Sequence, residues 1–172
     1  MAFLLLHGLG GDSSQPLSLV GPALPADARV LAPNIRAHGD SPLIGGPADY
    51  SFAAITRELL ATVRETGFDD EPLTIIGISL GAALSLRLAC SSVLAIERLV
   101  LLRPAFTDQP IPPNLAVFPV IAELLHRHPP DRAEAAFRRT GLYRSLREES
   151  RLGAAGVIEQ FHTPDAARAP FA

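Results

Sequence analysis

The sequence predicts an α/β fold: a mostly parallel sheet with about four recognisable strands, flanked by helices and followed by a helical cap. Short apolar runs alternate with longer stretches of helical pattern, and the runs are apolar on both faces rather than at every second residue. Strands buried on both faces have this composition, which is typical of parallel sheets covered by helices. With 172 residues, the chain is long enough for one compact unit of this kind.

Four short apolar segments are the strand candidates, and glycine or proline follows each of them closely. They are Phe3–Leu6, Arg29–Ala32, Leu73–Ile76 and Leu99–Leu102. The third is rich in β-branched residues, which favour strands. Glycine and proline interrupt regular structure, so they mark where each strand ends.

Two helices are expected between these strands. Ser51 is a good N-cap for a helix that runs to about Thr66, and Gly67 is its C-terminal stop. A second helix should run from about Leu80 to Cys90, directly after the third strand. Alternation of strand and helix at this spacing predicts βαβ units.

The character of the chain changes after the fourth strand, which divides it into a core, residues 1–105, and a helical cap-like segment, residues 106–172. The stretch Phe106–Pro113 holds three prolines and is predicted to be a loop. Three helices are expected beyond it, from an apolar stripe or a capping-box spacing. The first is Leu115–His126, with Pro119 in its first turns. The second begins at Asp131, which has a capping-box spacing with Glu134, and ends at Gly141. The third begins at Ser145, which has the same spacing with Glu148, and runs towards Phe161.

Composition excludes several classes of protein. Hydrophobic residues make up 48% and charged residues 19%, which excludes a disordered chain. The formal net charge of −3 argues against a nucleic-acid binder that relies on global positive charge. Cys90 is the single cysteine, so an internal disulfide and a cysteine metal cluster are excluded, and no metal or cofactor is expected.

The beginning of the chain does not have the pattern of a signal peptide or a membrane span. The apolar run Met1–Leu6 follows no basic segment and soon reaches a glycine cluster. Other apolar runs are too short to cross a bilayer. We therefore expect a cytoplasmic domain that acts on a small molecule and contacts neither membrane nor nucleic acid.

The segment Gly77–Gly81 has the pattern G-x-S-x-G in a suitable structural context. A predicted strand enters it and a predicted helix leaves it, as a nucleophile elbow requires. The sharp turn lifts the Ser79 hydroxyl above the sheet edge, and the helix N-terminus favours developing negative charge. Ser79 is thus the candidate nucleophile.

A second glycine-rich segment, His7–Gly11, follows the first strand. A loop there could present the backbone N–H of Leu9 beside that of Leu80. Two such donors would form an oxyanion hole for a tetrahedral intermediate. The same loop could instead cradle a phosphate, but it lacks the lysine and the spacing of the known phosphate-binding motifs.

Three motifs in order resemble those of the α/β-hydrolase superfamily, in its branch of esterases, lipases, epoxide hydrolases and C–C hydrolases. His7–Gly10 resembles the oxyanion segment, Arg36–Ser41 a conserved loop, and Gly77–Gly81 the elbow. Asn34 and Ala37 stand where the family usually has Asp and Gly. The resemblance implies a serine hydrolase acting on an ester or related carbonyl substrate. Transfer of the acyl group to another acceptor is a close variant.

In this family the nucleophile is followed by an acid and then a histidine. Asp108 follows the fourth strand, a position some members use, and is the tentative acid. After Ser79 the histidines are His126, His128 and His162, none of which follows a predicted strand. His162, near the C-terminus, is the tentative base, and the other two are more simply explained as surface residues.

The remaining histidines, His7 and His38, precede the serine and are interpreted as structural or pocket-lining residues.

By the same resemblance, the chain is shortened at both ends, because the strands that usually carry the acid and the histidine have no counterpart. The alternative function is therefore a truncated, catalytically incompetent fragment or a binding module. Shortening would also leave Leu99–Leu102 as an exposed apolar edge strand, which attracts other chains. A homodimer through this edge, cover by residues 152–172, or poor solubility is expected.

The cap-like segment is rich in arginine. Residues 127–151 contain seven Arg and four acidic residues. A basic mouth could favour an anionic substrate. Solvated helix faces with charge pairs at helical spacing are the simpler interpretation.

Overall fold

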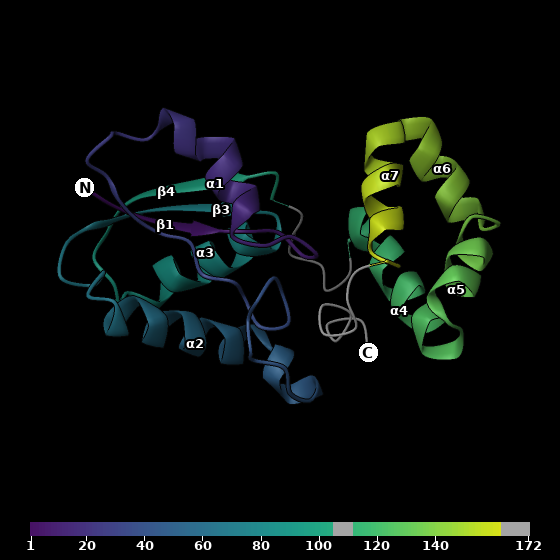
Figure 1. Cartoon of the computed structure of the whole chain (residues 1–172), viewed down its shortest axis with the longest axis horizontal. Helices are drawn as coiled ribbons and strands as arrows, with labels where there is room; N and C mark the ends of the chain where they lie inside the picture. The colour runs from purple at the N-terminus through teal and green to yellow at the C-terminus, as the bar shows by residue number, and fades with distance from the viewer. Residues whose placement is uncertain (105–111, 163–172) are drawn as a thin grey trace. The chain divides into compact units, whose positions relative to one another are not determined.

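The computed structural model describes residues 1–104 and 112–162. The chain divides into two compact units, Met1–Phe106 and Thr107–Ala172. Figure 1 shows the sheet and its helices in the first unit and four α-helices in the second.

The first unit is built on a four-stranded sheet, as predicted. The strands are β1 (Ala2–Leu6), β2 (Arg29–Leu31), β3 (Leu73–Ile78) and β4 (Ile96–Leu102). Their order is β2-β1-β3-β4, and every neighbouring pair is parallel. The carboxyl ends of all four strands therefore meet at one edge of the sheet, where ligands bind in open α/β sheets.

The α-helices of this unit are α1 (Ser14–Val20), α2 (Phe52–Glu65) and α3 (Leu80–Ser91), with 3₁₀ turns at Gly21–Ala23 and Pro47–Tyr50. The start of α2 is as predicted: the Ser51 hydroxyl accepts a hydrogen bond from the Ala54 N–H at 3.2 Å. Gly67 follows its C-terminal end with a φ of 67°, in the left-handed region that glycine favours. Helix α1 was not predicted, because its short sequence contains Pro16 and little periodicity.

The core fills both faces of the sheet because successive side chains of β1 point in opposite directions. Leu4 and Leu6 belong to one cluster together with residues of α2 and α3, such as Leu59 and Leu84. Phe3 and Leu5 form a second cluster on the opposite face, against which Val20 and Leu24 pack. Because both faces are covered, polar residues do not alternate with apolar ones along the central strands. The same packing fixes the position of β3.

Strand β4 lies at one edge of the sheet and pairs with β3 in the described part of the chain. Its residues are half-buried or exposed, and Val100 retains 38% of its accessible surface. The edge position agrees with the sequence prediction. Pairing of this edge with a second chain stays a prediction.

The second unit contains α4 (Val117–Arg127), α5 (Pro130–Phe137), α6 (Gly141–Glu149) and α7 (Arg151–Glu159), after a 3₁₀ turn at Pro113–Leu115. Its core includes three rings: Phe137 lies 5.5 Å from the rings of both Tyr143 and Phe161. Pro119 lies in the first turn of α4, as predicted.

The predicted start of α5 is wrong in detail. The helix begins at Pro130 after Pro129, with no side-chain cap from Asp131. Proline fits the first helical position, since its missing N–H would have no helical partner there. The helix ends at Phe137 rather than Gly141.

The predicted start of the following helix at Ser145 is also wrong, because two helices occupy this stretch. Thr140 caps α6 by accepting a hydrogen bond from Tyr143 N–H at 3.1 Å, so Ser145 lies inside that helix. Ser150 caps α7 by accepting one from Gly153 N–H at 2.9 Å. The spacing of Ser145 and Glu148 resembles a capping box but also fits an exposed helix face.

Among the helices that the structure describes, none combines the length and the apolar character needed to span a bilayer.

Candidate active site

Ser79 forms the turn between β3 and α3. Its φ is 51° and its ψ is −107°, a conformation that a residue with a side chain rarely adopts. The backbone is held there from two sides: Ser79 N–H donates to the Leu102 carbonyl oxygen at 3.0 Å, and its own carbonyl accepts from Ala83 N–H at 3.2 Å. The half-buried serine thus sits at the carboxyl edge of the sheet, at the N-terminus of a helix.

The two glycines of the motif allow α3 to approach the sheet. A β-carbon on Gly77 would lie 2.3 Å from the carbonyl oxygen of Gly81, and one on Gly81 would lie 2.3 Å from the carbonyl oxygen of Leu6. No real β-carbon makes such contacts. The buried Ser85 hydroxyl donates to the Gly81 carbonyl at 2.7 Å and closes the same turn. Glycine at both positions is therefore a packing requirement of the elbow.

The loop after β1 lies beside the serine. A β-carbon on Gly8 would be 3.5 Å from the Ser79 β-carbon and 3.5 Å from the carbonyl oxygen of Ile78. Leu9 is the next residue, and Leu80 opens α3, where first-turn N–H groups lack a helical acceptor. The loop that carries Leu9 therefore lies beside the turn that carries Ser79 and Leu80.

Gln15 holds this loop in place and was missed by sequence reasoning. Its side-chain oxygen accepts a hydrogen bond from Gly8 N–H at 2.8 Å, and its amide packs against Gly11 so closely that a β-carbon there would lie 2.9 Å away. Gly11 N–H in turn donates to the Gly8 carbonyl at 3.1 Å. No sequence signal identifies a glutamine on an unpredicted helix as a loop support.

His7 is a buried structural residue whose two ring nitrogens both bond to backbone. Nδ1 donates to the Gly8 carbonyl at 2.8 Å, and Nε2 accepts from Ile35 N–H at 3.0 Å. These partners specify the neutral tautomer. Burial lowers the pKa of His7 to about 4, with the nearby His38 as a smaller cause. The ring therefore ties β1 to the loop after β2 and has no free nitrogen for catalysis.

His38 is buried beside His7, with ring centroids 5.0 Å apart. Its Nδ1 donates to the Arg36 carbonyl at 2.7 Å, while its Nε2 has no hydrogen-bond partner among the described residues. Burial lowers the pKa of His38. These contacts fit the structural or pocket-lining interpretation.

Asn34 and Ala37, the two departures from the family pattern, are accommodated in this loop. The Asn34 side-chain oxygen accepts a hydrogen bond from Ser13 N–H at 2.7 Å, and its amide nitrogen donates to the Asp40 carboxylate. An aspartate could accept but could not donate, so asparagine suits a site facing Asp40. Ala37 has a φ of 58°, so its backbone is strained in a way that glycine would avoid.

Asp108 and His162, the tentative acid and base, stay predictions. Asp108 lies outside the described residues. His162 belongs to the second unit, where its Nε2 pairs with the Glu134 carboxylate. This pairing is the main cause of the lowered pKa of Glu134, followed by the bond from Arg138. His126 lies in the last turn of α4 with an exposed side chain.

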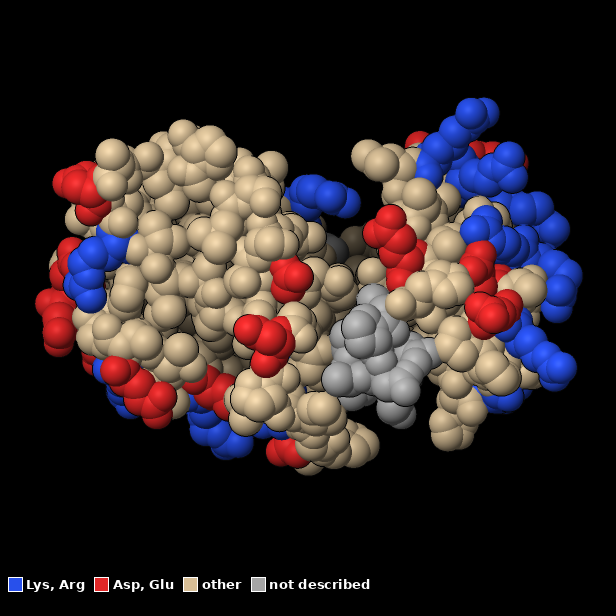
Figure 2. Space-filling model, in the orientation of Figure 1, with Lys and Arg blue, Asp and Glu red and all other residues tan. Residues whose placement is uncertain are grey.

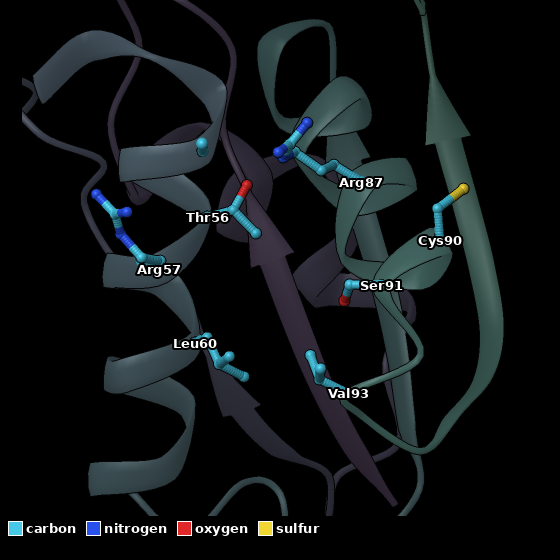
Figure 3. A pocket seen from close by; sticks show the side chains of 8 residues that line it. Thr56, Arg57, Leu60, Arg87, Cys90, Ser91 and Val93 are labelled. Carbon is cyan, nitrogen blue, oxygen red and sulfur yellow. The ribbon is translucent and has the colours of Figure 1, made fainter. Parts of the chain in front are cut away.

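A groove of about 450 Å³ between α2 and α3 is separate from this site. Figure 3 shows Arg57 and Arg87 towards one end of it and Leu60 and Val93 towards the other. Ser79 does not line it. In the part of the chain that the structure describes, no group of three His, Cys, Asp or Glu is placed to hold a metal ion.

Comparison with known families agrees with this geometry. The sequence matches the family model of the alpha/beta hydrolase fold over residues 2–145. The chain belongs to the α/β-hydrolase fold family. The matched range includes the elbow, the loop after β1 and most of the second unit.

The relatives within this family span more than the chain itself. An uncharacterized protein of Mycobacterium tuberculosis is 36% identical over 103 residues, which are 58% of this chain and 28% of that protein. A hydrolase from Pseudomonas aeruginosa superposes with a TM-score of 0.66 at 21% identity, over 99% of this chain and 62% of its own. At that identity the likeness concerns the fold alone.

A third relative carries an activity in its description. The monoacylglycerol lipase of Paleococcus ferrophilus is 28% identical, with a TM-score of 0.52, over 73% of this chain and 46% of its own. The chain thus spans less than two thirds of the length of each of these three proteins.

Proposed function

We propose that this α/β hydrolase is a serine hydrolase that acts on an ester or related carbonyl compound, with Ser79 as the nucleophile. The observation that carries the proposal is the backbone of Ser79, a non-glycine residue at a φ of 51° on a turn between strand and helix. Strain of this kind costs about 1–3 kcal/mol and is typical of functional sites. Here it directs a hydroxyl to the sheet edge where ligands bind.

In the proposed reaction, the Ser79 Oγ attacks the carbonyl carbon of the substrate while its proton passes to a base. The carbonyl oxygen becomes an oxyanion, which the N–H groups of Leu9 and Leu80 stabilise. Each such donor is worth about 10²–10³ in kcat. The tetrahedral intermediate collapses, the alcohol leaves with the proton from the base, and an acyl-enzyme remains. Water then attacks the acyl carbon, and the acid product is released with Ser79 restored.

The proposed base is His162 and the proposed acid is Asp108. Both follow Ser79 in the chain order of the family, serine then acid then histidine. His162 already has a carboxylate partner, Glu134, which orients its ring. Without a base, a serine at its ordinary pKa is a poor nucleophile.

The substrate is proposed to be a small ester, in line with the lipase among the relatives. No cofactor or metal takes part in this mechanism. The competing proposal is a binding module that keeps the elbow without its base. The pairing of His162 Nε2 with Glu134 favours it, because that ring nitrogen is then already engaged.

Hydrolysis of short-chain 4-nitrophenyl esters by the purified chain separates the two. Ser79→Ala should reduce turnover to background, whereas the control Ser18→Ala, an exposed residue of α1, should leave it unchanged. His162→Gln should lower kcat by at least ~10³, the scale of losing a general base. Activity that survives Ser79→Ala would overturn the nucleophile. A folded but inactive wild-type chain would favour the binding module.

A further inference from the structure

The second unit carries a concavity rich in arginine that the proposed reaction does not use. It has a volume of about 470 Å³ and lies where α6 and α7 meet the end of α5. Three of the residues that line it are Arg138, Arg147 and Arg151. Figure 2 shows arginine side chains gathered over the α5 and α6 part of this unit.

Arg138 is held in a fixed orientation at this concavity. Its Nη1 donates to the Tyr143 hydroxyl at 2.7 Å, and its Nε donates to the Glu134 carboxylate. The guanidinium also lies over the Tyr143 ring, 5.4 Å from the centroid. Glu134 is itself tied to His162. A guanidinium oriented in this way loses less entropy when it binds an anion.

Arg147 and Arg151 are exposed and lack an ion-pair partner among residues 1–104 and 112–162. Glu159 is the acidic residue among those that line the concavity. Arg138 is already paired with Glu134, so Arg147 and Arg151 share the single carboxylate of Glu159 and leave an excess of one positive charge. Unpaired cations that share a hollow attract an anion more strongly than dispersed surface charges do.

The concavity also has an apolar wall, formed by residues of α7. Ala154 and Ile158 of α7 line the concavity with buried side chains, and exposed Ala155 lies beside them. A ligand that fits both walls combines an anionic group with a compact apolar body. This composition distinguishes the concavity from a merely solvated basic helix face.

We propose that this concavity binds a soluble phosphate monoester, with the phosphoryl group on Arg147 and Arg151 and its apolar body against Ala154 and Ile158. Guanidinium forks match phosphate oxygens in bidentate pairs. A phosphoryl group also presents three acceptor oxygens, so it can bond to both guanidinium groups at once, whereas a carboxylate presents two. The site is independent of Ser79, so its test does not depend on the hydrolase proposal.

Phenyl phosphate is the probe, titrated into the full chain at low ionic strength and followed by calorimetry and by NMR of the arginine side chains. Saturable binding should weaken at least tenfold in the double variant Arg147→Gln/Arg151→Gln. The matched control Arg144→Gln removes an exposed arginine of α6 that does not line the concavity, and should retain the wild-type affinity.

Further ligands test the chemistry. Benzoate and inorganic phosphate, which each lack one half of the ligand, should bind at least tenfold more weakly than phenyl phosphate. Phosphatidate vesicles distinguish a lipid headgroup from a soluble ester. Binding to vesicles without binding to phenyl phosphate would overturn the proposal. Equal losses in the double variant and in Arg144→Gln would do the same, because they would indicate screening by overall charge.

Discussion

Gly81 and Leu6 come so close together that a β-carbon on Gly81 would lie 2.3 Å from the Leu6 carbonyl oxygen. This contact presses the first turn of α3 against the end of β1. It also sets the distance between the elbow and the loop that carries Leu9. The packing of a glycine is thus directly connected to the arrangement of the proposed oxyanion donors.

Gly81→Ala should therefore destabilise the fold by about 3 kcal/mol, since the new methyl group meets backbone rather than a movable side chain. Chemical denaturation measures the change. Gly156→Ala is the matched control, because a β-carbon at that position of α7 meets nothing within 4 Å. It should stabilise its helix by about 0.5–1 kcal/mol. Similar effects of the two substitutions would contradict the close contact.

Ser79 should be a site where stability is traded for function. Ser79→Gly relieves the positive φ and should make the chain about 1 kcal/mol more stable than Ser79→Ala, which keeps the strain. Both variants remove the hydroxyl, so the comparison isolates the backbone. Thermal unfolding of the pair gives the difference. An alanine variant as stable as the glycine variant would show that the turn is unstrained.

Asn34 should not tolerate the aspartate that the family pattern usually has at this position. Asn34→Asp replaces the amide donor with a carboxylate facing Asp40, which should cost about 1–2 kcal/mol at neutral pH. The double variant Asn34→Asp/Asp40→Asn restores a donor and an acceptor, so it should recover most of the loss. Denaturation of the four proteins forms a double-mutant cycle. Additive losses would contradict the pairing.

Stability should fall as the pH falls from about 6.5 to 4, in part because of His7. Its pKa is lowered to about 4 in the folded chain, so the unfolded chain binds more protons in that window. The neutral ring therefore contributes its full stability above 6.5 and loses about 3 kcal/mol by pH 4. Urea denaturation across this range should show a shallower slope for His7→Gln. An unchanged slope would mean that the ring titrates normally.

Much of the fold could be predicted because the sheet is buried on both faces. Runs such as Leu73–Ile78 are buried on both faces and mostly apolar, and glycine or proline follows each strand, so the number of strands and the order of the elements could be predicted. The starts of the cap-like helices were harder to predict. Asp131 and Ser145 have the spacing of helix starts, but α5 begins at Pro130 and α6 is capped by Thr140. Spacing alone does not show which of several possible residues caps a helix.

The candidate site was predictable to the extent that it is local in sequence. Ser79 and Leu80 lie on one turn, and the glycines on either side of them indicate its geometry. The supports of that turn come from elsewhere: Gln15 and Asn34 act through contacts that only tertiary structure brings about. The groups around Arg138 likewise come from separate segments: Glu134 from α5, Tyr143 from α6, and His162, which bonds to Glu134, from beyond the end of α7.

The central claim is that Ser79 is an activated nucleophile, and covalent labelling with a fluorophosphonate tests it most directly. The purified 172-residue chain and its Ser79→Ala variant are treated together and read by peptide mass spectrometry. We predict that one adduct forms rapidly on Ser79 and that no adduct forms on the variant. An adduct on Ser79 that forms no faster than on other serines of the folded chain would show that Ser79 is not activated.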